Sequence, residues 1–216
     1  MAQVLRFTFN PFQENTYIVY DETKECIIFD PGCFSSEERK ELKAKIEELQ
    51  LKPVRLINTH CHIDHVFGNA FVQREYELAL EIHKGEVPVL EAVPMVAQMY
   101  SIPMPEPSPA AGRFIEEEEE IRFGNTILRS IFTPGHSPAS LSFFCEKDRF
   151  LIAGDVLFEG SIGRTDLPGG DYNTLIAVIK EKLFPLGDDV VVYPGHGEAT
   201  TIQAERLTNP FVGEKK

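Results

Sequence analysis

The chain has 216 residues, of which 43% are hydrophobic, and its formal net charge is −13. This size suits one large domain with a substantial core, and we expect a single domain over residues 1–216. The sequence has no run of about 18 apolar residues that could cross a membrane, and its excess of acidic residues disfavours nucleic acid as a partner.

The N-terminus lacks the basic and then apolar layout of a signal peptide, so we expect a cytoplasmic protein with no membrane partner. The four cysteines are scattered and include no C-x-x-C pair. This pattern predicts reduced cysteines that pack in the interior, and it indicates neither a disulfide scaffold nor a thiolate zinc site.

The first half of the chain alternates strands and helices. Residues 17–20 and 26–29 are apolar, β-favouring runs around a polar turn, which predicts a hairpin. A helix is expected to begin at Ser35 or Ser36, and a short strand over 54–57 leads directly to His60. A helix over 66–80 and a strand near Ile82 follow, so the pattern is that of an α/β protein.

Residues 88–109 contain several prolines and methionines and form the least regular part of the sequence. We interpret them as a surface connection, with a lid over an apolar substrate pocket as the alternative. The acidic run Glu116–Glu120 is interpreted as a solvated turn, and His83 as a structural histidine on a strand.

Two segments align without gaps, residues 15–30 and residues 140–155. Each has an apolar strand, a charged turn, a second apolar strand and a closing aspartate. This similarity predicts two related halves, each a sheet with helices on one side, and a ligand cleft where the halves meet.

The strongest feature is the run His60-Cys61-His62-Ile63-Asp64-His65. Alternate side chains of an extended backbone point the same way, so His60 and His62 can converge on one ion while Asp64 and His65 turn toward a second. Three further candidates follow apolar strands. His136 and His196 each come after a Pro-Gly turn, and Asp155 comes after a glycine. Strand exits are where α/β folds place ligands, so we expect a metal site.

These four motifs, in this order over roughly residues 10–200, resemble the metallo-β-lactamase superfamily. The resemblance implies an αβ/βα sandwich of two mixed β-sheets flanked by helices. It also implies two divalent metal ions, with zinc expected and iron or manganese as alternatives. One ion would be held by His60, His62 and His136, the second by Asp64, His65 and His196, and Asp155 would bridge them. Asp30 would hold the histidine loop in place without binding the ions itself.

Within the superfamily, Asn15-Thr16-Tyr17, Gly163–Asp166 and the segment from Glu205 to Phe211 are similar to short glyoxalase II-like proteins, the hydroxyacylglutathione hydrolases. This likeness implies a thioester hydrolase acting on a small hydroxyacyl-thiol ester such as lactoylglutathione. Asp64 and Asp155 are the candidate catalytic residues, and metal-activated hydroxide would be the nucleophile. The thiol carrier and the oligomeric state stay open.

Three alternative functions are considered. His60, His136 and Asp155 also form the set of two histidines and one carboxylate that suits mononuclear iron, so a persulfide dioxygenase is the main alternative. A lactonase is a variant of the hydrolase hypothesis, and a non-catalytic metal-binding protein is disfavoured because all seven ligands are present. Arg164 could bind a substrate carboxylate, but we expect it to pair with Asp166.

Overall fold

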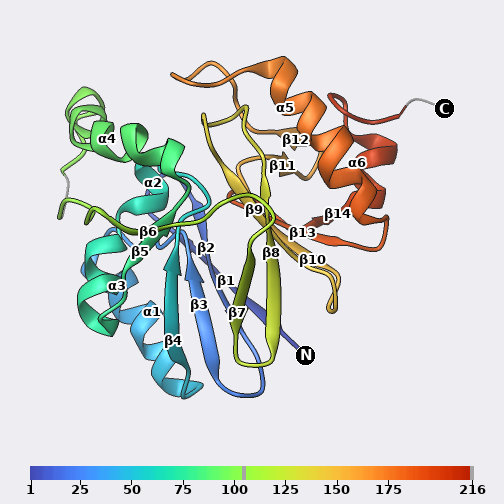
Figure 1. Ribbon diagram of the computed structural model, residues 1–216. Coiled ribbons are helices and arrows are strands. Elements are labelled where there is room, and N and C mark those ends of the chain that lie inside the picture. Colours follow the sequence, from blue (N-terminus) through green and yellow to red (C-terminus); the bar gives the residue numbers. More distant parts are fainter. Residues whose placement is uncertain (104–105, 215–216) are drawn as a thin grey trace. The chain divides into compact units, whose positions relative to one another are not determined.

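The computed structural model describes residues 1–103 and 106–214 (Figure 1). The chain forms two compact units. The first comprises Met1–Ile115 with Arg122–Ile127, and the second comprises Glu116–Ile121 with Leu128–Lys216. Each contains a six-stranded sheet or most of one, and the expectation of a single domain over residues 1–216 stays a prediction.

The first unit contains a mixed sheet in the order β1-β2-β3-β4-β5-β6. Its strands are β1 (Gln3–Phe9), β2 (Glu14–Tyr20), β3 (Glu25–Phe29), β4 (Lys52–Ile57), β5 (Leu80–Ile82) and β6 (Ala111–Phe114). Its helices are α1 (Ser36–Glu48), α2 (Ile63–Val66), α3 (Asn69–Tyr76) and α4 (Val87–Met99), with a 3₁₀ turn η1 (Lys84–Glu86). The pairs β1–β2 and β2–β3 are antiparallel, whereas β3 to β6 run parallel, so β3, β4 and β5 end at one edge of the sheet.

The start of α1 is fixed by a capping box. Ser35 caps the helix and accepts a hydrogen bond from the backbone N–H of Glu38, while the Glu38 carboxylate accepts from the backbone of Ser35. The same carboxylate also accepts from the backbone N–H of Asn10, 2.7 Å away, in the turn after β1. Leu42 and Ile46 on one face of α1 are buried in the core.

The second sheet has the order β14-β13-β10-β9-β8-β7, in which β10 and β13 run parallel. Its strands are β7 (Glu120–Phe123), β8 (Thr126–Phe132), β9 (Leu141–Cys145), β10 (Phe150–Gly154), β13 (Val191–Pro194) and β14 (Thr200–Thr201), and a separate hairpin consists of β11 (Leu157–Phe158) and β12 (Ser161–Ile162). The helices are α5 (Tyr172–Val178) and α6 (Ile202–Thr208), with a π-helical turn η2 (Ile179–Leu183) and a 3₁₀ turn η3 (Phe184–Leu186). The tip of the β7–β8 hairpin belongs to the first unit.

The internal similarity found in the sequence corresponds to a repeated structure. Strands β2 and β3 form an antiparallel pair, and so do β9 and β10. Lys24 and Arg149, which occupy equivalent positions in the two turns, both have positive φ angles, 73° and 55°. Asp30 and Asp155 each follow directly after the second strand of their pair. Each repeat therefore delivers an aspartate at the carboxyl end of a strand.

Two element predictions are wrong in part. Within the predicted helix over 66–80, α2 ends at Val66, α3 covers only Asn69–Tyr76 after a break near Gly68, and Leu80 already belongs to β5. A Cβ atom at Gly68 would lie 2.4 Å from the Sγ of Cys33 and 2.6 Å from the carbonyl oxygen of Pro31, so the chain passes too close for any other residue.

The segment 88–109 is also more regular than expected. It contains α4, which has a proline in its first turn, where no N–H is needed, and a second proline, Pro94, within it. The buried face of Leu90, Val93 and Ala97 compensates for the hydrogen bond that Pro94 removes. Of the methionines in this segment, Met95 and Met99 are exposed, and Met104 lies outside the described residues.

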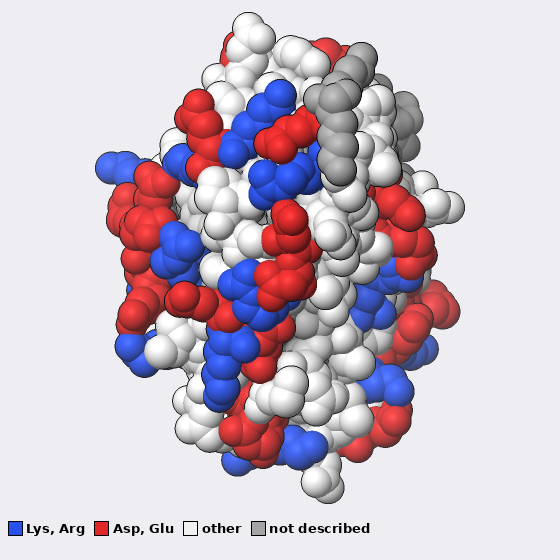
Figure 2. Space-filling model, turned by 90° about the vertical axis from the view of Figure 1, so that its right-hand side faces the viewer, with Lys and Arg blue, Asp and Glu red and all other residues white. Residues whose placement is uncertain are grey.

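All four cysteines are buried and free, as the sequence predicts. No helix among residues 1–103 and 106–214 is long and apolar enough to cross a membrane. On the face drawn in Figure 2, Lys and Arg side chains lie among Asp and Glu side chains.

Candidate metal centre

Four of the predicted ligands lie together in the first unit, after the carboxyl end of β4. His60 and His62 are in the loop and Asp64 and His65 in α2. The ring centroid of His60 lies 4.8 Å from that of His62 and 4.1 Å from that of His65, and His60 and His65 are fully buried. The loop therefore gathers three imidazoles and a carboxylate into one small volume.

Asp30 supports these imidazoles, as the family resemblance implies. Its two carboxylate oxygens accept hydrogen bonds from the backbone N–H of Thr59 at 2.7 Å and from the Thr59 hydroxyl at 2.6 Å. Its Oδ2 also lies 3.1 Å from Nδ1 of His65. A carboxylate at Nδ1 favours the tautomer in which Nε2 carries no proton and is a ligand. The Nε2 atom of His65 lies on the side of Asp64, 3.8 Å from its Oδ2.

The backbone of the histidine loop is held by three polar side chains that the sequence analysis missed. Asn58 donates to the carbonyl oxygen of His65 at 2.9 Å, and Asn10 donates to that of Asp64 at 3.0 Å. The fully buried carboxylate of Glu86 accepts from the backbone N–H of Cys61 at 2.9 Å. Contacts of a side chain with the backbone leave no residue pattern in the sequence, which explains why they were not found.

Glu14 is a further residue that the sequence analysis missed. It is fully buried at the start of β2, its Oε1 lies 3.8 Å from Nδ1 of His65, and its Oε2 accepts a hydrogen bond from Thr16 at 3.0 Å. Burial raises the pKa of this carboxyl group well above its ordinary value, with smaller contributions in the same direction from Asp30 and Asp64 and an opposing one from His65. Glu14 precedes the polar residues Asn15 and Thr16 at the start of the strand, so the residue pattern does not distinguish it from a solvated carboxylate.

The other three predicted ligands lie together in the second unit. His136 follows β8, Asp155 follows β10 and His196 follows β13. The Oδ2 atom of Asp155 lies 3.4 Å from Nε2 of His136 and 3.5 Å from Nε2 of His196. Asp155 is therefore placed between the two imidazoles.

The tautomer of His136 is also set by a neighbour. Its Nδ1 lies 2.7 Å from the carbonyl oxygen of Arg164, so Nδ1 is the protonated nitrogen and Nε2 faces Asp155. The chain can approach this closely because residue 163 is glycine. A Cβ atom at Gly163 would lie 2.0 Å from the carbonyl oxygen of Asp155 and 3.1 Å from Cβ of His136.

The donor atoms around Asp155 are spaced as ligands of a divalent metal ion are. Ligands about 2.1 Å from a tetrahedral ion lie roughly 3.4 Å from each other, which is close to the separations around Asp155. The donors are imidazoles and carboxylates, a set that accepts zinc, iron or manganese. Burial, with Glu86 and Asp30 nearby, raises the pKa of the Cys61 thiol well above its ordinary value.

The residues that were interpreted as structural have structural partners. His83 follows β5, and its Nδ1 accepts from the backbone N–H of Gly85 at the start of η1. Arg164 forms two hydrogen bonds with Asp166, at 2.7 and 2.8 Å, as expected.

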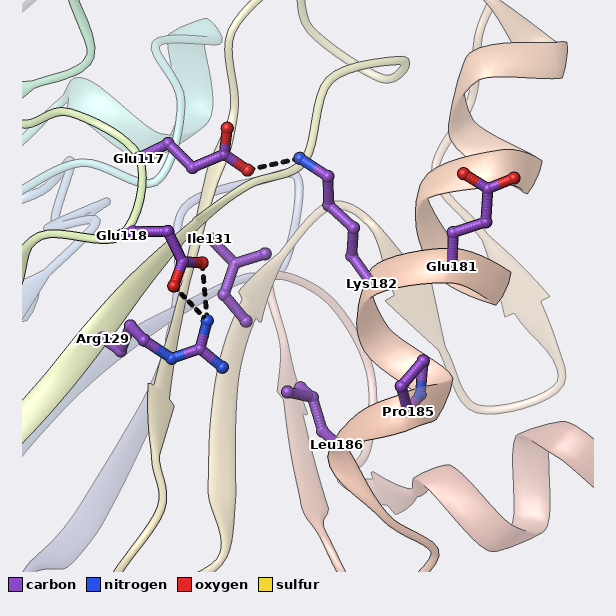
Figure 3. Close-up of a pocket in the computed structure, with 8 residues that line it drawn as sticks. All are labelled: Glu117, Glu118, Arg129, Ile131, Glu181, Lys182, Pro185 and Leu186. Carbon is purple, nitrogen blue, oxygen red and sulfur yellow. Dashed lines mark hydrogen bonds and ion pairs between the residues drawn. The ribbon is translucent and has the colours of Figure 1, made fainter.

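The acidic run Glu116–Glu120 borders a surface cavity of about 350 Å³ in the second unit (Figure 3). In this cavity Glu117 pairs with Lys182, and Glu118 pairs with Arg129. The charges are thus paired with each other at the surface, which supports the interpretation as a solvated turn.

Comparison with known proteins identifies the class. The sequence matches the metallo-beta-lactamase superfamily over residues 9–196, and the chain belongs to this superfamily. The fold class is confirmed as α/β with two mixed β-sheets flanked by helices, as in solved structures of this fold. The chain is accordingly a metallo-hydrolase of this superfamily with a cluster of histidines and aspartates suited to metal.

The relatives are similar over almost their whole lengths. A curated relative, the hydroxyacylglutathione hydrolase GloC of Haemophilus influenzae, is 37% identical over 207 residues, which cover 94% of this chain and 95% of that protein. The crystal structure of the BLEG-1 B3 metallo-beta-lactamase is 34% identical, with a TM-score of 0.89 and coverage of 97% of this chain and 99% of that one. The structure of TTHA1623 in a di-iron-bound form is 33% identical, with a TM-score of 0.85 and coverage of 96% and 99%.

Proposed function

We propose that this protein is a binuclear metallohydrolase that cleaves small hydroxyacyl-thiol esters. His60, His62 and His136 would hold one divalent ion, Asp64, His65 and His196 the other, and Asp155 would bridge them. The observation that carries the proposal is the position of Asp155, whose Oδ2 lies 3.4 and 3.5 Å from the Nε2 atoms of two histidines. The similarity to a hydroxyacylglutathione hydrolase over 94% of the chain supports the substrate class.

Bound divalent ions lower the pKa of water toward about 7 and polarise a carbonyl oxygen. The residues of the chain keep the ligands in the right form for this chemistry. The Asp30 carboxylate lies beside Nδ1 of His65, and the carbonyl oxygen of Arg164 accepts at Nδ1 of His136, so that both Nε2 atoms carry a lone pair. Asp64 and Asp155 contribute negative charge, and they are the candidate catalytic residues.

The leaving group explains why no further acid is needed. A thiol has an ordinary pKa of about 8.5, so a thiolate departs near neutral pH without a proton donor. Zinc is the proposed metal, and iron is its main alternative, because one relative with 33% identity has been solved in a di-iron-bound form.

The test measures metal content and thiol release with the same protein. The wild type is expected to contain two metal ions per chain and to release thiol from a lactoyl thioester of glutathione. His196→Ala is expected to lose the second ion and at least about 100-fold in kcat/KM, whereas His83→Ala, which changes a structural histidine, is expected to keep both. The rate with the lactoyl thioester of N-acetylcysteamine is compared with the rate for the glutathione thioester, and the difference measures the contribution of the thiol carrier.

Two rival activities are measured on the same samples. Oxygen uptake with a persulfide tests the dioxygenase alternative, which needs only His60, His136 and Asp155. Hydrolysis of a β-lactam tests the activity named for one relative of 34% identity. The proposal is wrong if the wild type cleaves no thioester and His196→Ala consumes oxygen as fast as the wild type.

A further inference from the structure

Three segments of the second unit meet at one buried carboxylate, that of Glu205 on α6. Glu205 is 1% exposed. Its Oε2 accepts hydrogen bonds from the backbone N–H of Gly160 at 2.9 Å and from the side-chain amide of Asn209 at 2.7 Å, and its Oε1 accepts from the Thr200 hydroxyl at 2.6 Å. Within the described part of the chain, no Lys, Arg or His forms an ion pair with Glu205.

Two of these segments come directly after proposed metal ligands. Gly160 lies in the turn of the β11–β12 hairpin, which begins soon after Asp155. Thr200 begins β14, shortly after His196. The amide of Asn209 also donates to the carbonyl oxygen of Ser161 at 2.9 Å, so α6 holds the hairpin at two points. The Glu205 carboxylate thereby connects the segment after Asp155 with the segment after His196.

The hydrogen bonds at this position favour a carboxylate. A buried charge without a cationic partner is costly unless several hydrogen bonds satisfy it, and here three donors do so. A glutamine of the same shape has only one acceptor oxygen, so it would keep all three contacts only if the Thr200 hydroxyl turned round to accept from the amide N–H, and the bonds to Gly160 and Asn209 would lose their charge assistance. An apolar residue would leave three buried donors without acceptors.

We propose that Glu205 is a positioning residue that sets Asp155 and His196 relative to each other, acting through the β11–β12 hairpin and the start of β14. The proposal rests on the proposed function, in which Asp155 and His196 are metal ligands. Glu205 itself binds no metal. Residues that orient ligands in this indirect way typically change metal affinity by about 10- to 100-fold when they are replaced.

The main experiment compares the full-length wild type with Glu205→Gln. Zn²⁺ affinity is measured by competition with a chromophoric chelator, and the visible absorption of bound Co²⁺ reports the coordination geometry. We expect Glu205→Gln to weaken Zn²⁺ binding by about 10-fold or more and to change the Co²⁺ spectrum. A residue with a purely structural role would lower stability without either change.

Two variants of Thr200 test its hydrogen bond to Glu205 with a smaller change to the protein. Thr200→Val removes the hydroxyl that donates to Glu205 while keeping the shape of the side chain, and Thr200→Ser keeps the hydroxyl. We expect the valine variant to weaken Zn²⁺ binding and the serine variant to retain it. This pair decides the question if Glu205→Gln does not fold.

The matched control lies on the same helix. Arg206 donates to the carboxylate of Asp188 at 3.0 Å and its guanidinium lies 4.8 Å from the ring centroid of Phe184, so it attaches α6 to η3 without contacting Glu205. Arg206→Ala is expected to lower the stability of the protein and to leave Zn²⁺ affinity and the Co²⁺ spectrum unchanged. If it weakens Zn²⁺ binding as much as Glu205→Gln, the effect is one of general stability and the positioning role is overturned.

The outcomes separate this inference from the proposed function. If His196→Ala binds Zn²⁺ with the same stoichiometry and affinity as the wild type, the proposed metal site is wrong and the positioning role falls with it. If His196→Ala loses an ion while Glu205→Gln and Thr200→Val both match the wild type, the metal site stands and only the role of Glu205 is rejected.

Discussion

At the scale of single residues, Asp30 orients two of the proposed ligands, His65 directly and His60 through Thr59. One carboxylate accepts two hydrogen bonds from Thr59 and lies 3.1 Å from Nδ1 of His65, and the Thr59 hydroxyl lies 3.1 Å from Nδ1 of His60. Asp30 also has a φ angle of 47°, so the chain turns sharply at the point where the carboxylate is needed. Two ligands are therefore oriented from one side chain.

Replacing Asp30 by alanine is expected to lower Zn²⁺ affinity by about 10- to 100-fold, because the tautomer and orientation of His65 are no longer fixed. The free energy of unfolding should fall by about 1–3 kcal/mol, because the buried donors of Thr59 lose their acceptor. Competition titration and urea unfolding measure the two effects. Asp189→Ala removes the same charge from an exposed pair with Arg149 and should leave Zn²⁺ affinity unchanged. Equal affinity in Asp30→Ala and the wild type would contradict this role.

The proposed ligands are visible in the sequence, whereas the side chains that hold them in place mostly are not. His60, His62, Asp64 and His65 stand in one short motif, and each remaining ligand follows an apolar strand. Glu86 and Glu205 are far along the chain from the segments they bind, and they bind backbone N–H groups, which every residue type except proline offers. Only the folded backbone brings such partners together.

At the scale of elements, the antiparallel strand pairs could be predicted from the sequence, whereas the helix α4 could not. The hairpin over residues 17–29 and its counterpart after Ser140 are visible as apolar runs around charged turns, and both form as antiparallel pairs. The helix α4 was not predicted, because two prolines within 13 residues usually indicate irregular structure. Its stability comes from burying Leu90, Val93 and Ala97, which is a tertiary effect that local preference does not reveal.

The turn between β2 and β3 carries a titratable contact. The buried carboxylate of Asp21 accepts from the backbone and hydroxyl of Thr23, from the backbone of Asn125 and from the hydroxyl of Thr126. Burial acts to raise the pKa of Asp21, but these hydrogen bonds to the charged form outweigh it, so the pKa lies below its ordinary value. The turn is thus joined to the tip of the β7–β8 hairpin by a charge-dependent contact.

The depressed pKa determines how stability depends on pH. The folded form binds fewer protons at Asp21 than the unfolded chain does, so its contribution is complete above the unfolded pKa of about 3.9 and is lost as the pH falls through the folded pKa. We expect Asp21→Asn to be about 1–3 kcal/mol less stable than the wild type at pH 7 and the difference to shrink below about pH 4. Urea unfolding at several pH values measures this. Glu41→Gln on α1 is the control, and a difference that is independent of pH would refute the role of the charge.

At the scale of the whole molecule, the metal site and the hydrophobic cores contribute separately to stability. Each unit has its own cluster of buried apolar residues, around Ile28 and Leu56 in the first and around Leu151 and Leu175 in the second. Hydrophobic burial is the main source of folding free energy, so we expect both units to stay folded when metal is removed. The proposed ions then add to the stability only through binding to the folded state.

Removal of the metal by a chelator is therefore expected to lower Tm without abolishing the fold. A ligand at 100 times its Kd stabilises the folded state by about 2.7 kcal/mol, which corresponds to about 5–11 °C for a chain of this size. Circular dichroism follows both the spectrum at 25 °C and the thermal transition. His83→Ala should show the same shift as the wild type, and His196→Ala a smaller one because it has already lost a proposed ligand. A loss of the folded spectrum at 25 °C after chelation would show that the two cores are insufficient and that the metal is needed for folding itself.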